Sequence, residues 1–386
     1  MNEVRVNRKA ARRVASGHPW IFESDVVDKE GAEPGAAVKV VNLAGKALGT
    51  AHFSAASQIA LRMLSRDVEE IGREFFAQRL AAAEAHRRRV APGVDAYRVV
   101  YGEGDLLPAL VVDRYANYLV LQTLNQGMDA AREWIVASLV ELFSPRGIVA
   151  RNDAAVRARE ALPLESGVIY GEVPDTVEFG MNGLRLRADL LHGQKTGAFL
   201  DQRENYTAAA RYARGKALDC FTCTGGFALH LAPVCESVEA LDSSGAALAV
   251  AGRNAALNGI SNIEFREADV FVLLAAYSSA RRQFQTVVLD PPAFAKSRST
   301  LEGAVRGYKE INLRALRLLG PGGILVTCSC SQRLTEAALL ELVAQASLDA
   351  GRQLRVLERR TQAPDHPILL TVPETHYLKC LILEVL

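Results

Sequence analysis

The sequence predicts an α/β protein of three domains. The chain has 386 residues, of which 49% are hydrophobic and 23% charged, and this is enough for two or three packed cores. From about residue 189 onward, short β-rich runs alternate with helical stretches, which is typical of a mostly parallel sheet covered by helices on both faces. Near the start, short β-rich runs are separated by glycines, as in a small barrel. The predicted domains are a small β-barrel at 1–68, a small α+β domain at 69–188 and the α/β domain at 189–386.

A local basic patch lies at the start of the predicted barrel. It comprises five basic residues followed by two aromatic ones: Arg5, Arg8, Lys9, Arg12, Arg13, Trp20 and Phe22. Because the formal net charge of the chain is only +1, a binding site for a polyanion has to be a local patch of this kind. Arg12, Arg13 and Trp20 are therefore candidates to contact phosphates and stack on bases. The same residues could instead form a charged rim around a small core.

The predicted central domain begins with a helix. Residues 68–90 have apolar side chains at helical spacing, acidic residues in the first turn and His86-Arg87-Arg88-Arg89 in the last turn, which suits the helix dipole. We expect these arginines to form a solvated helix end, in preference to an RNA contact. The segments 97–104, 107–124, 127–143 and 147–153 then predict strand, strand, helix and strand.

Several classes of protein are excluded by what the sequence lacks. No uninterrupted run of about 18 apolar residues occurs, and Met1 is followed by a polar, basic segment, so we expect a cytoplasmic protein without a membrane span. Six cysteines in a chain of this length are too few for a disulfide scaffold. Cys220 and Cys223 lack the two further ligands of a zinc or iron–sulfur site, so no metal is predicted.

The first informative strand end of the C-terminal domain is ALDCFTCTGGF, residues 217–227. In an open parallel sheet, ligands bind at the carboxyl ends of the strands. Asp219 closes the predicted strand, and Gly225 with Gly226 lets the backbone turn sharply into a helix that begins at Phe227. The G-x-G-x-x-G spacing that cradles a pyrophosphate is absent, which argues against a nicotinamide oxidoreductase. The turn suits a ligand with an amino-acid part, whose ammonium group Asp219 could hold directly or through water.

Two further acids follow the next two strands. Asp242 is placed to accept both hydroxyls of a ribose, and Asp269 is placed to accept from an adenine amine. Each acid alone is weak evidence, because an aspartate after a strand is often a helix N-cap. Together with Asp219, they describe an amino acid, a ribose and an adenine in chain order. S-adenosylmethionine has those three parts.

The fourth strand end, VVLDPPAFAKS, stiffens the loop after Asp290. Pro291 and Pro292 end the strand and remove two backbone donors. A rigid loop beside a methyl donor can hold a flat substrate, and Phe294 offers a ring on which a base could stack. Phe294 could instead be packed in the core.

The chain resembles the RlmI-type 23S ribosomal RNA (cytosine-C5) methyltransferases over nearly its whole length. The motifs that carry the resemblance are HPW (18–20), HGQKTGAFLDQRENY (192–206), CFTCTGGF (220–227), LDPPAF (289–294), RGYKEIN (306–312) and SCS (329–331). The resemblance implies an N-terminal PUA RNA-binding domain and a C-terminal class I methyltransferase domain. That domain would have a Rossmann-like, mostly parallel seven-stranded sheet and would bind S-adenosylmethionine. It also implies a 23S ribosomal RNA substrate, favours RNA contact for the basic patch, and is compatible with a homodimer.

The resemblance also implies site residues. Candidate contacts to the cofactor or the substrate in the HGQKTGAFLDQR segment are Gln194, Lys195, Thr196, Phe199, Gln202 and Arg203. Phe221, Gly225 and Ser243 flank the predicted acids and are further candidates for cofactor contacts. Lys195 is the candidate of this set for contact with the RNA substrate.

Cys330 is the predicted nucleophile. Enzymes of this type add a thiolate to carbon 6 of cytosine, because carbon 5 alone is too weak a nucleophile to take a methyl group. Cys328 follows the apolar run ILVT and is expected to be packed, whereas Cys330 lies further past the strand end and falls in the SCS match. Asp290 is the candidate base for the carbon 5 proton, or else a hydrogen-bond partner of the cytosine ring. Other candidates for positioning are Lys296, Tyr308 and Lys309.

Two other functions remain open from the residues. An Asp-Pro-Pro-aromatic loop also suits methylation of a base nitrogen, which needs no cysteine. A noncatalytic RNA-binding assembly factor would use the basic patch and bind no cofactor.

Overall fold

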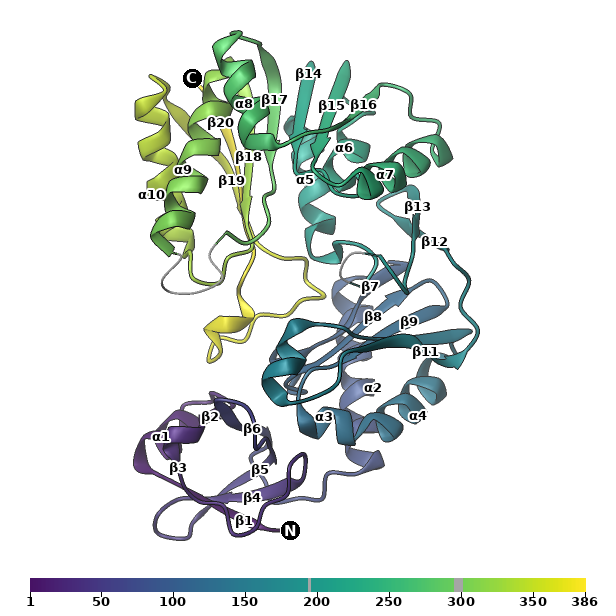
Figure 1. Cartoon of the computed structure of the whole chain (residues 1–386), viewed down its shortest axis with the longest axis vertical. Coiled ribbons are helices and arrows are strands. Elements are labelled where there is room, and N and C mark those ends of the chain that lie inside the picture. The colour runs from purple at the N-terminus through teal and green to yellow at the C-terminus, as the bar shows by residue number, and fades with distance from the viewer. Residues whose placement is uncertain (194–195, 295–300) are drawn as a thin grey trace. The chain divides into compact units, whose positions relative to one another are not determined.

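The computed structural model describes residues 1–193, 196–294 and 301–386, which divide into two compact units (Figure 1). The first unit comprises residues 1–180, 188–198 and 364–375, and the second comprises residues 181–187, 199–363 and 376–386. A hairpin of β12 (Val177–Met181) and β13 (Leu184–Ala188) contains the first boundary between them. Short 3₁₀ helices occur at Glu23–Asp25, Gly102–Asp105, Ala155–Glu160, Leu200–Gln202 and Pro373–Thr375. Within the described ranges, no helix combines the length and apolar character needed to cross a membrane.

The N-terminal part of the first unit is a curled six-stranded sheet with one helix. Its strands are β1 (Glu3–Val6), β2 (Trp20–Phe22), β3 (Val26–Asp28), β4 (Ala37–Val41), β5 (Ala47–Phe53) and β6 (Ile59–Ser65). They pair in the order β2-β6-β5-β4-β1-β3. Helix α1 (Arg8–Ala15) begins at Asn7, whose side chain accepts from the Ala10 amide, and it adds Ala10 and Val14 to the small core. This agrees with the predicted small β domain.

The rest of the first unit is built on a five-stranded sheet. Its elements are α2 (Arg73–Val90), β7 (Ala96–Tyr101), β8 (Leu110–Tyr115), β9 (Tyr118–Thr123), α3 (Gln126–Ala130), α4 (Arg132–Phe143), β10 (Gly147–Asn152) and β11 (Glu165–Gly171). The strand order is β11-β10-β9-β8-β7. Residues 107–124 form two strands where one was predicted, because Ala116 takes a positive φ of 51° and reverses the chain. The predicted helix at 127–143 is divided into α3 and α4 at Ala131.

The expected solvated arginine cluster at the end of α2 is wrong for Arg87. Its side chain is 1% exposed and forms a bidentate ion pair with Asp105, in which Nη2 lies 2.7 Å from Oδ2. Arg87 also donates to the carbonyl oxygens of Arg98 and Asp365, both at 2.8 Å. Arg88 and Arg89 are exposed, as expected. Arg87 therefore joins α2, β7 and the segment 364–375 inside the first unit.

The second unit is a seven-stranded sheet in the order β16-β15-β14-β17-β18-β20-β19. Its strands are β14 (Lys216–Cys220), β15 (Ser237–Asp242), β16 (Ile263–Glu267), β17 (Phe284–Leu289), β18 (Leu319–Ser329), β19 (Leu354–Arg360) and β20 (Lys379–Val385). The first five are parallel, and β20 runs antiparallel to both of its neighbours. The predicted mostly parallel sheet is confirmed.

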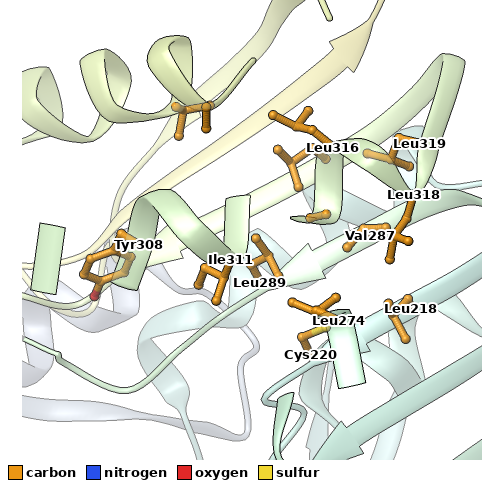
Figure 2. Close-up of a cluster of buried hydrophobic side chains, with 14 of the residues drawn as sticks. Leu218, Cys220, Leu274, Val287, Leu289, Tyr308, Ile311, Leu316, Leu318 and Leu319 are labelled. Atoms are coloured by element: carbon orange, nitrogen blue, oxygen red, sulfur yellow. The ribbon is translucent and has the colours of Figure 1, made fainter. Parts of the chain in front are cut away.

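Helices cover both faces of this sheet. They are α5 (Arg203–Tyr212), α6 (Gly226–Leu231), α7 (Gly245–Leu257), α8 (Val270–Ser279), α9 (Leu301–Arg317) and α10 (Glu336–Asp349). Helix α9 packs between α8 and α10 on one face, and α5, α6 and α7 lie on the other (Figure 1). The core on the α8–α9–α10 face contains Leu274 and Ile311 of the helices with Val287 and Leu289 of β17 (Figure 2). Tyr308 also belongs to this core, and its hydroxyl oxygen lies 3.0 Å from Oγ of Ser329, the last residue of β18 (Figure 2).

Replacing Arg87 by methionine tests the buried ion pair. The change leaves the Asp105 carboxylate buried without its partner, and we expect it to lower the free energy of unfolding by about 3–5 kcal/mol. Both tryptophans of the chain, Trp20 and Trp134, lie in the first unit, so urea unfolding followed by tryptophan fluorescence reports on this unit. Arg89→Met is the matched control, with an expected change within about 0.5 kcal/mol. Equal effects of the two substitutions would contradict the assignment.

Candidate active site

Several of the predicted site residues lie at one edge of the sheet in the second unit, where the carboxyl ends of its parallel strands meet. In the parallel register, Cys220 of β14 lies opposite Leu241 of β15 and Leu289 of β17, and Leu289 lies opposite Thr327 of β18. Asp242 and Asp290 therefore come one residue past this line, and Cys330 comes three residues past it. Because β17 lies between β14 and β18, Asp290 is placed between the turn after β14 and Cys330.

The turn after β14 is strained. Phe221, Cys223 and Gly225 have positive φ angles of 65°, 51° and 88°, and two of these residues are not glycine. The Thr222 amide donates to the Leu241 carbonyl at 2.9 Å, and the Gly225 amide donates to the Thr222 carbonyl at 2.8 Å. At Gly226, a Cβ atom would lie 2.4 Å from the Tyr206 hydroxyl oxygen, so this position requires glycine. The sharp turn that was predicted before helix α6 is thus a loop fixed by backbone hydrogen bonds.

Asp219 supports this turn from the interior. Its side chain has no exposed surface, and its Oδ2 atom accepts from Thr222 Oγ1 at 2.6 Å and from the Ala228 amide at 2.9 Å. Its Oδ1 atom is buried without a hydrogen-bond partner among the described residues. Burial raises the pKa of the Asp219 carboxyl to about 7, and the nearby Asp290 and Asp242 carboxylates add to the effect. An unsatisfied buried carboxyl oxygen fits a cationic ligand group held through water.

Asp242 and Asp269 differ in what they can offer to a ligand. Asp242 is half-buried and accepts from the Cys223 amide at 2.8 Å and the Ser244 amide at 2.9 Å, one bond to each oxygen. Each of these oxygens has a second lone pair, which suits two ribose hydroxyls. Asp269 is exposed, and its Oδ1 atom accepts from the Val272 amide at 3.1 Å as the N-cap of α8. Ser243 is exposed beside Asp242.

Asp290 is held by a residue of the HGQKTGAFLDQR segment. Gln202 Nε2 donates to Asp290 Oδ2 at 3.0 Å, and Gln202 Oε1 accepts from Asn205 Nδ2 at 2.7 Å. The Asp290 amide donates to the Cys220 carbonyl at 3.3 Å. Gln202 and Arg203 are 2% and 1% exposed, and Arg203 pairs with Glu204 at 3.0 Å. Gln202 therefore orients the Asp290 carboxylate, and Arg203 is equally buried.

Phe294 belongs to an aromatic cluster at the same edge. Its ring centroid lies 4.7 Å from that of Tyr308, 5.7 Å from that of Phe271 and 6.4 Å from that of Phe221. The ring is half-buried and packs against the hydrophobic core. Phe294 is thus partly packed, as one of the two expectations had it, while part of its surface stays exposed.

The two cysteines of VTCSCS occupy different environments. Cys328 lies inside β18 with no exposed surface, directly opposite Cys380 of β20, and burial together with Cys380 raises the pKa of the Cys328 thiol well above its usual range. The expectation that Cys328 is packed is confirmed. Cys330 is half-buried and follows the last residue of β18. Cys220 is also fully buried, in the hydrophobic core.

Tyr308 and Lys379 surround the chain at Cys330. Tyr308 is buried, and its hydroxyl oxygen lies 3.0 Å from Ser329 Oγ and 3.2 Å from Ser331 Oγ. Lys379, the first residue of β20, is 3% exposed and donates to the Ser331 carbonyl at 2.6 Å. Sequence analysis did not identify Lys379. A lysine that opens the apolar run KCLILEV was the available signal.

The remaining candidates are not assembled at this edge. Lys309 pairs with Asp349 at 2.8 Å, which fits a surface role. Thr196 belongs to the first unit, where its hydroxyl donates to Asp113 Oδ2 at 2.5 Å. Phe199 precedes the 3₁₀ turn that carries Gln202. Gln194, Lys195 and Lys296 lie outside the described residues.

The candidate RNA-binding residues of the N-terminal domain differ in the contacts that they already make within the protein. Arg13 donates to Asp25 Oδ2 at 2.8 Å and lies over the Phe22 ring at 4.8 Å. Trp20 donates its indole N–H to Glu103 Oε1 at 2.8 Å. Arg12 is exposed, and no ion pair of its guanidinium occurs among the described residues. Arg12 is therefore the best placed of the three for an external phosphate.

Comparisons with known proteins match two regions of the chain to known domain families. Residues 4–66 match a PUA-like domain, and residues 111–383 match the S-adenosylmethionine-dependent methyltransferase domain. The chain aligns over 100% of its length with two solved structures at 19% identity. One is a putative methyltransferase complexed with SAH, with a TM-score of 0.87, and the other is a putative SAM-dependent methyltransferase from Streptococcus mutans, with a TM-score of 0.85. These likenesses confirm the predicted fold class.

The sequence is also similar to curated proteins over most of its length. It is 44% identical over 377 residues to ribosomal RNA large subunit methyltransferase I of Shewanella amazonensis and 43% identical over 378 residues to the protein of that name from Tolumonas auensis, with 95% of each chain covered in both comparisons. The buried acid, the strand-end carboxylate and the strained turn fit the cofactor of the matched domain, S-adenosylmethionine. The chain belongs to the ribosomal RNA large subunit methyltransferase I family and is an S-adenosylmethionine-dependent methyltransferase.

Proposed function

We propose that this protein methylates carbon 5 of a cytosine in large-subunit (23S) ribosomal RNA, through a covalent bond between Cys330 and carbon 6. The names of the similar curated proteins support ribosomal RNA as the substrate, and the PUA-like domain supports RNA binding. This substrate implies a cytoplasmic protein. The observation that carries the choice of carbon 5 is the position of Cys330, a half-buried cysteine just beyond β18 at the strand edge that also carries Asp242 and Asp290.

In the proposed reaction, Cys330 activates the base. Bound S-adenosylmethionine supplies an electrophilic methyl group, and Asp242 is the residue proposed to hold its ribose. The Cys330 thiolate forms a bond to carbon 6 of cytosine, and the electron pair of the C5–C6 double bond makes carbon 5 nucleophilic. After carbon 5 is methylated, loss of its proton to a base restores the double bond, breaks the bond between sulfur and carbon 6 and releases the thiolate.

Asp290 is the proposed partner of the cytosine ring. Its carboxylate is oriented by Gln202, and Asp290 directly follows β17, the strand between β14 and β18. From there it can take the carbon 5 proton, or accept a hydrogen bond from the exocyclic amine of cytosine. Phe294, half-buried four residues after Asp290, would support one face of the base.

Methylation of a base nitrogen is the second candidate function. It is favoured by the Asp290-Pro291-Pro292 loop, which suits an in-plane hydrogen bond to an amine. Methylation of a nitrogen needs no nucleophilic residue of the protein. In that case Cys330 would be an ordinary residue of the loop.

Replacing Cys330 by alanine distinguishes these functions. We expect Cys330→Ala to abolish methyl transfer to large-subunit ribosomal RNA and to remove the covalent adduct that the wild-type protein forms with RNA containing 5-fluorocytosine, because fluorine blocks the release of the thiol. The adduct is detected as a band of reduced mobility on a denaturing gel. Cys328→Ala is the matched control and should still form the adduct, since Cys328 is buried. A fully active Cys330→Ala protein would favour the nitrogen reaction.

Replacing Asp242 by asparagine tests the proposed ribose contact. Loss of a charged acceptor costs about 1.5–3 kcal/mol, so the dissociation constant for S-adenosylmethionine should rise about 10-fold to 100-fold. Isothermal titration calorimetry measures this constant directly. Glu264→Gln, an exposed substitution on the neighbouring strand β16, should leave the constant unchanged. An unchanged constant in Asp242→Asn would remove Asp242 from the cofactor site.

The salt dependence of RNA binding tests the basic patch. If Arg12 contacts a phosphate, Arg12→Ala should reduce the slope of the logarithm of the affinity against the logarithm of the salt concentration by about 1. Arg13→Ala should change the slope less, because the Arg13 guanidinium is already paired with Asp25. Filter binding of large-subunit ribosomal RNA over a series of KCl concentrations gives both slopes. A slope that Arg12→Ala leaves unchanged would show that the patch is only a charged rim.

A further inference from the structure

Lys379 is a buried cation in β20, opposite the last residue of β18, the strand that Cys330 follows. It lies in β20 directly opposite Ser329 of β18, and it is 3% exposed. Lysine is almost never fully buried unless it is paired, because desolvation of an ammonium group is costly. The interior position of Lys379 therefore needs an explanation in terms of what its charge contacts.

The hydrogen bonds of Lys379 use two of the three N–H donors of its ammonium group. Its Nζ atom donates to the carbonyl oxygens of Ser331 at 2.6 Å and Tyr377 at 2.7 Å. An ammonium group has three N–H donors, so one remains. Among the described residues, no carboxylate pairs with Lys379. Two carbonyl groups satisfy donors but do not neutralise a positive charge.

Among the described residues, Cys330 is the group whose charge is found to act on Lys379. The peptide carbonyl that Lys379 contacts belongs to Ser331, the residue that follows Cys330. Burial lowers the pKa of the Lys379 ammonium to about 8, and negative charge on Cys330 acts in the opposite direction. At neutral pH, the ammonium is therefore still mostly protonated. It provides a positive charge beside the thiol.

Among the described residues, three other titratable groups near the end of β18 do not supply this charge. Tyr308 of α9 is buried, and burial raises the pKa of its hydroxyl, so it is neutral. Asp290, after β17, is a carboxyl group, and a negative charge on it would oppose formation of a thiolate. Arg333, on the loop after β18, is exposed. Within the described part of this unit, Lys379 is therefore the buried cation next to Cys330.

We propose that Lys379 is a positioning residue that keeps Cys330 in the thiolate form before RNA binds. The inference rests on the proposed role of Cys330 as the nucleophile. A hydrogen-bond donor without charge could hold the Ser331 and Tyr377 carbonyls equally well, so the ammonium has a function that amide side chains would not serve. A free cysteine has a pKa of about 8.5, and a cation beside the thiol lowers it, which increases the fraction of reactive thiolate at neutral pH.

Alkylation of Cys330 over a range of pH tests this role. The full-length protein, without RNA and cofactor, is treated with iodoacetamide from about pH 6 to pH 9.5, a range that spans the usual thiol pKa. Fragmentation of the peptide that contains Cys330 in the mass spectrometer distinguishes its alkylation from that of Cys328, which lies two residues earlier on the same peptide. Lys379→Gln keeps a donor but removes the charge, and Lys379→Arg keeps the charge. Lys216→Gln, an exposed substitution at the opposite end of β14, is the matched control.

The expected result is a midpoint for Cys330 alkylation below pH 8 in the wild-type protein. In Lys379→Gln the midpoint should rise by about one pH unit or more, with a corresponding fall of about tenfold in the alkylation rate at neutral pH. Lys379→Arg should restore a low midpoint, and Lys216→Gln should have no effect. Calorimetry with S-adenosylmethionine should give equal dissociation constants for the variants, which shows that the cofactor side of the site is intact.

Two results would overturn the inference without affecting the proposed function. One is a wild-type midpoint at pH 8.5 or above, which can be measured even if no Lys379 variant folds. The other is an equal midpoint in Lys379→Gln and the wild type. The proposed function fails separately, if the wild-type protein forms no adduct with RNA containing 5-fluorocytosine while its Cys330 midpoint is low.

Discussion

The candidate site depends on the parallel pairing of β14, β17 and β18. Each strand is buried on both faces, and its apolar side chains fix the register, because a slip of one residue would exchange the two faces. With the observed register, the turn after β14, Asp290 and Cys330 follow three adjacent strands. Neighbouring strands are about 4.8 Å apart, so residues that are distant in sequence come within reach of one ligand.

Most of the residues at the carboxyl ends of these strands could be predicted from the sequence, because the patterns that indicate them involve only neighbouring residues. A strand pattern followed by a polar residue is enough to place Asp242 and Asp290 at strand ends. The difference between Cys328 and Cys330 was also accessible, since an apolar run leads into Cys328 and polar residues flank Cys330. What the local pattern did not decide is how each side chain is used. The Asp269 carboxylate, for instance, caps α8, which is the more common role of an aspartate after a strand.

Features that depend on distant partners were missed. Arg87 looked solvated because its partners are not nearby in the sequence: the Asp365 carbonyl that it contacts lies 278 positions away. The interior place of Lys379 likewise depends on Ser331, 48 positions earlier. The hairpin at Ala116 was missed for a different reason. A positive φ is usually provided by glycine or asparagine, and here alanine adopts it.

The strained turn after β14 has a consequence for how the sequence can change over evolution. Glycine at positions 221 and 223 would relieve the left-handed backbone of Phe221 and Cys223. Selection for thermal stability alone would therefore favour replacing both side chains. The Phe221 side chain is kept despite this strain, and its ring centroid lies 6.4 Å from that of Phe294, a contact that glycine would remove. Laboratory evolution toward higher melting temperature would be expected to alter this loop first, and to lose that contact between the rings.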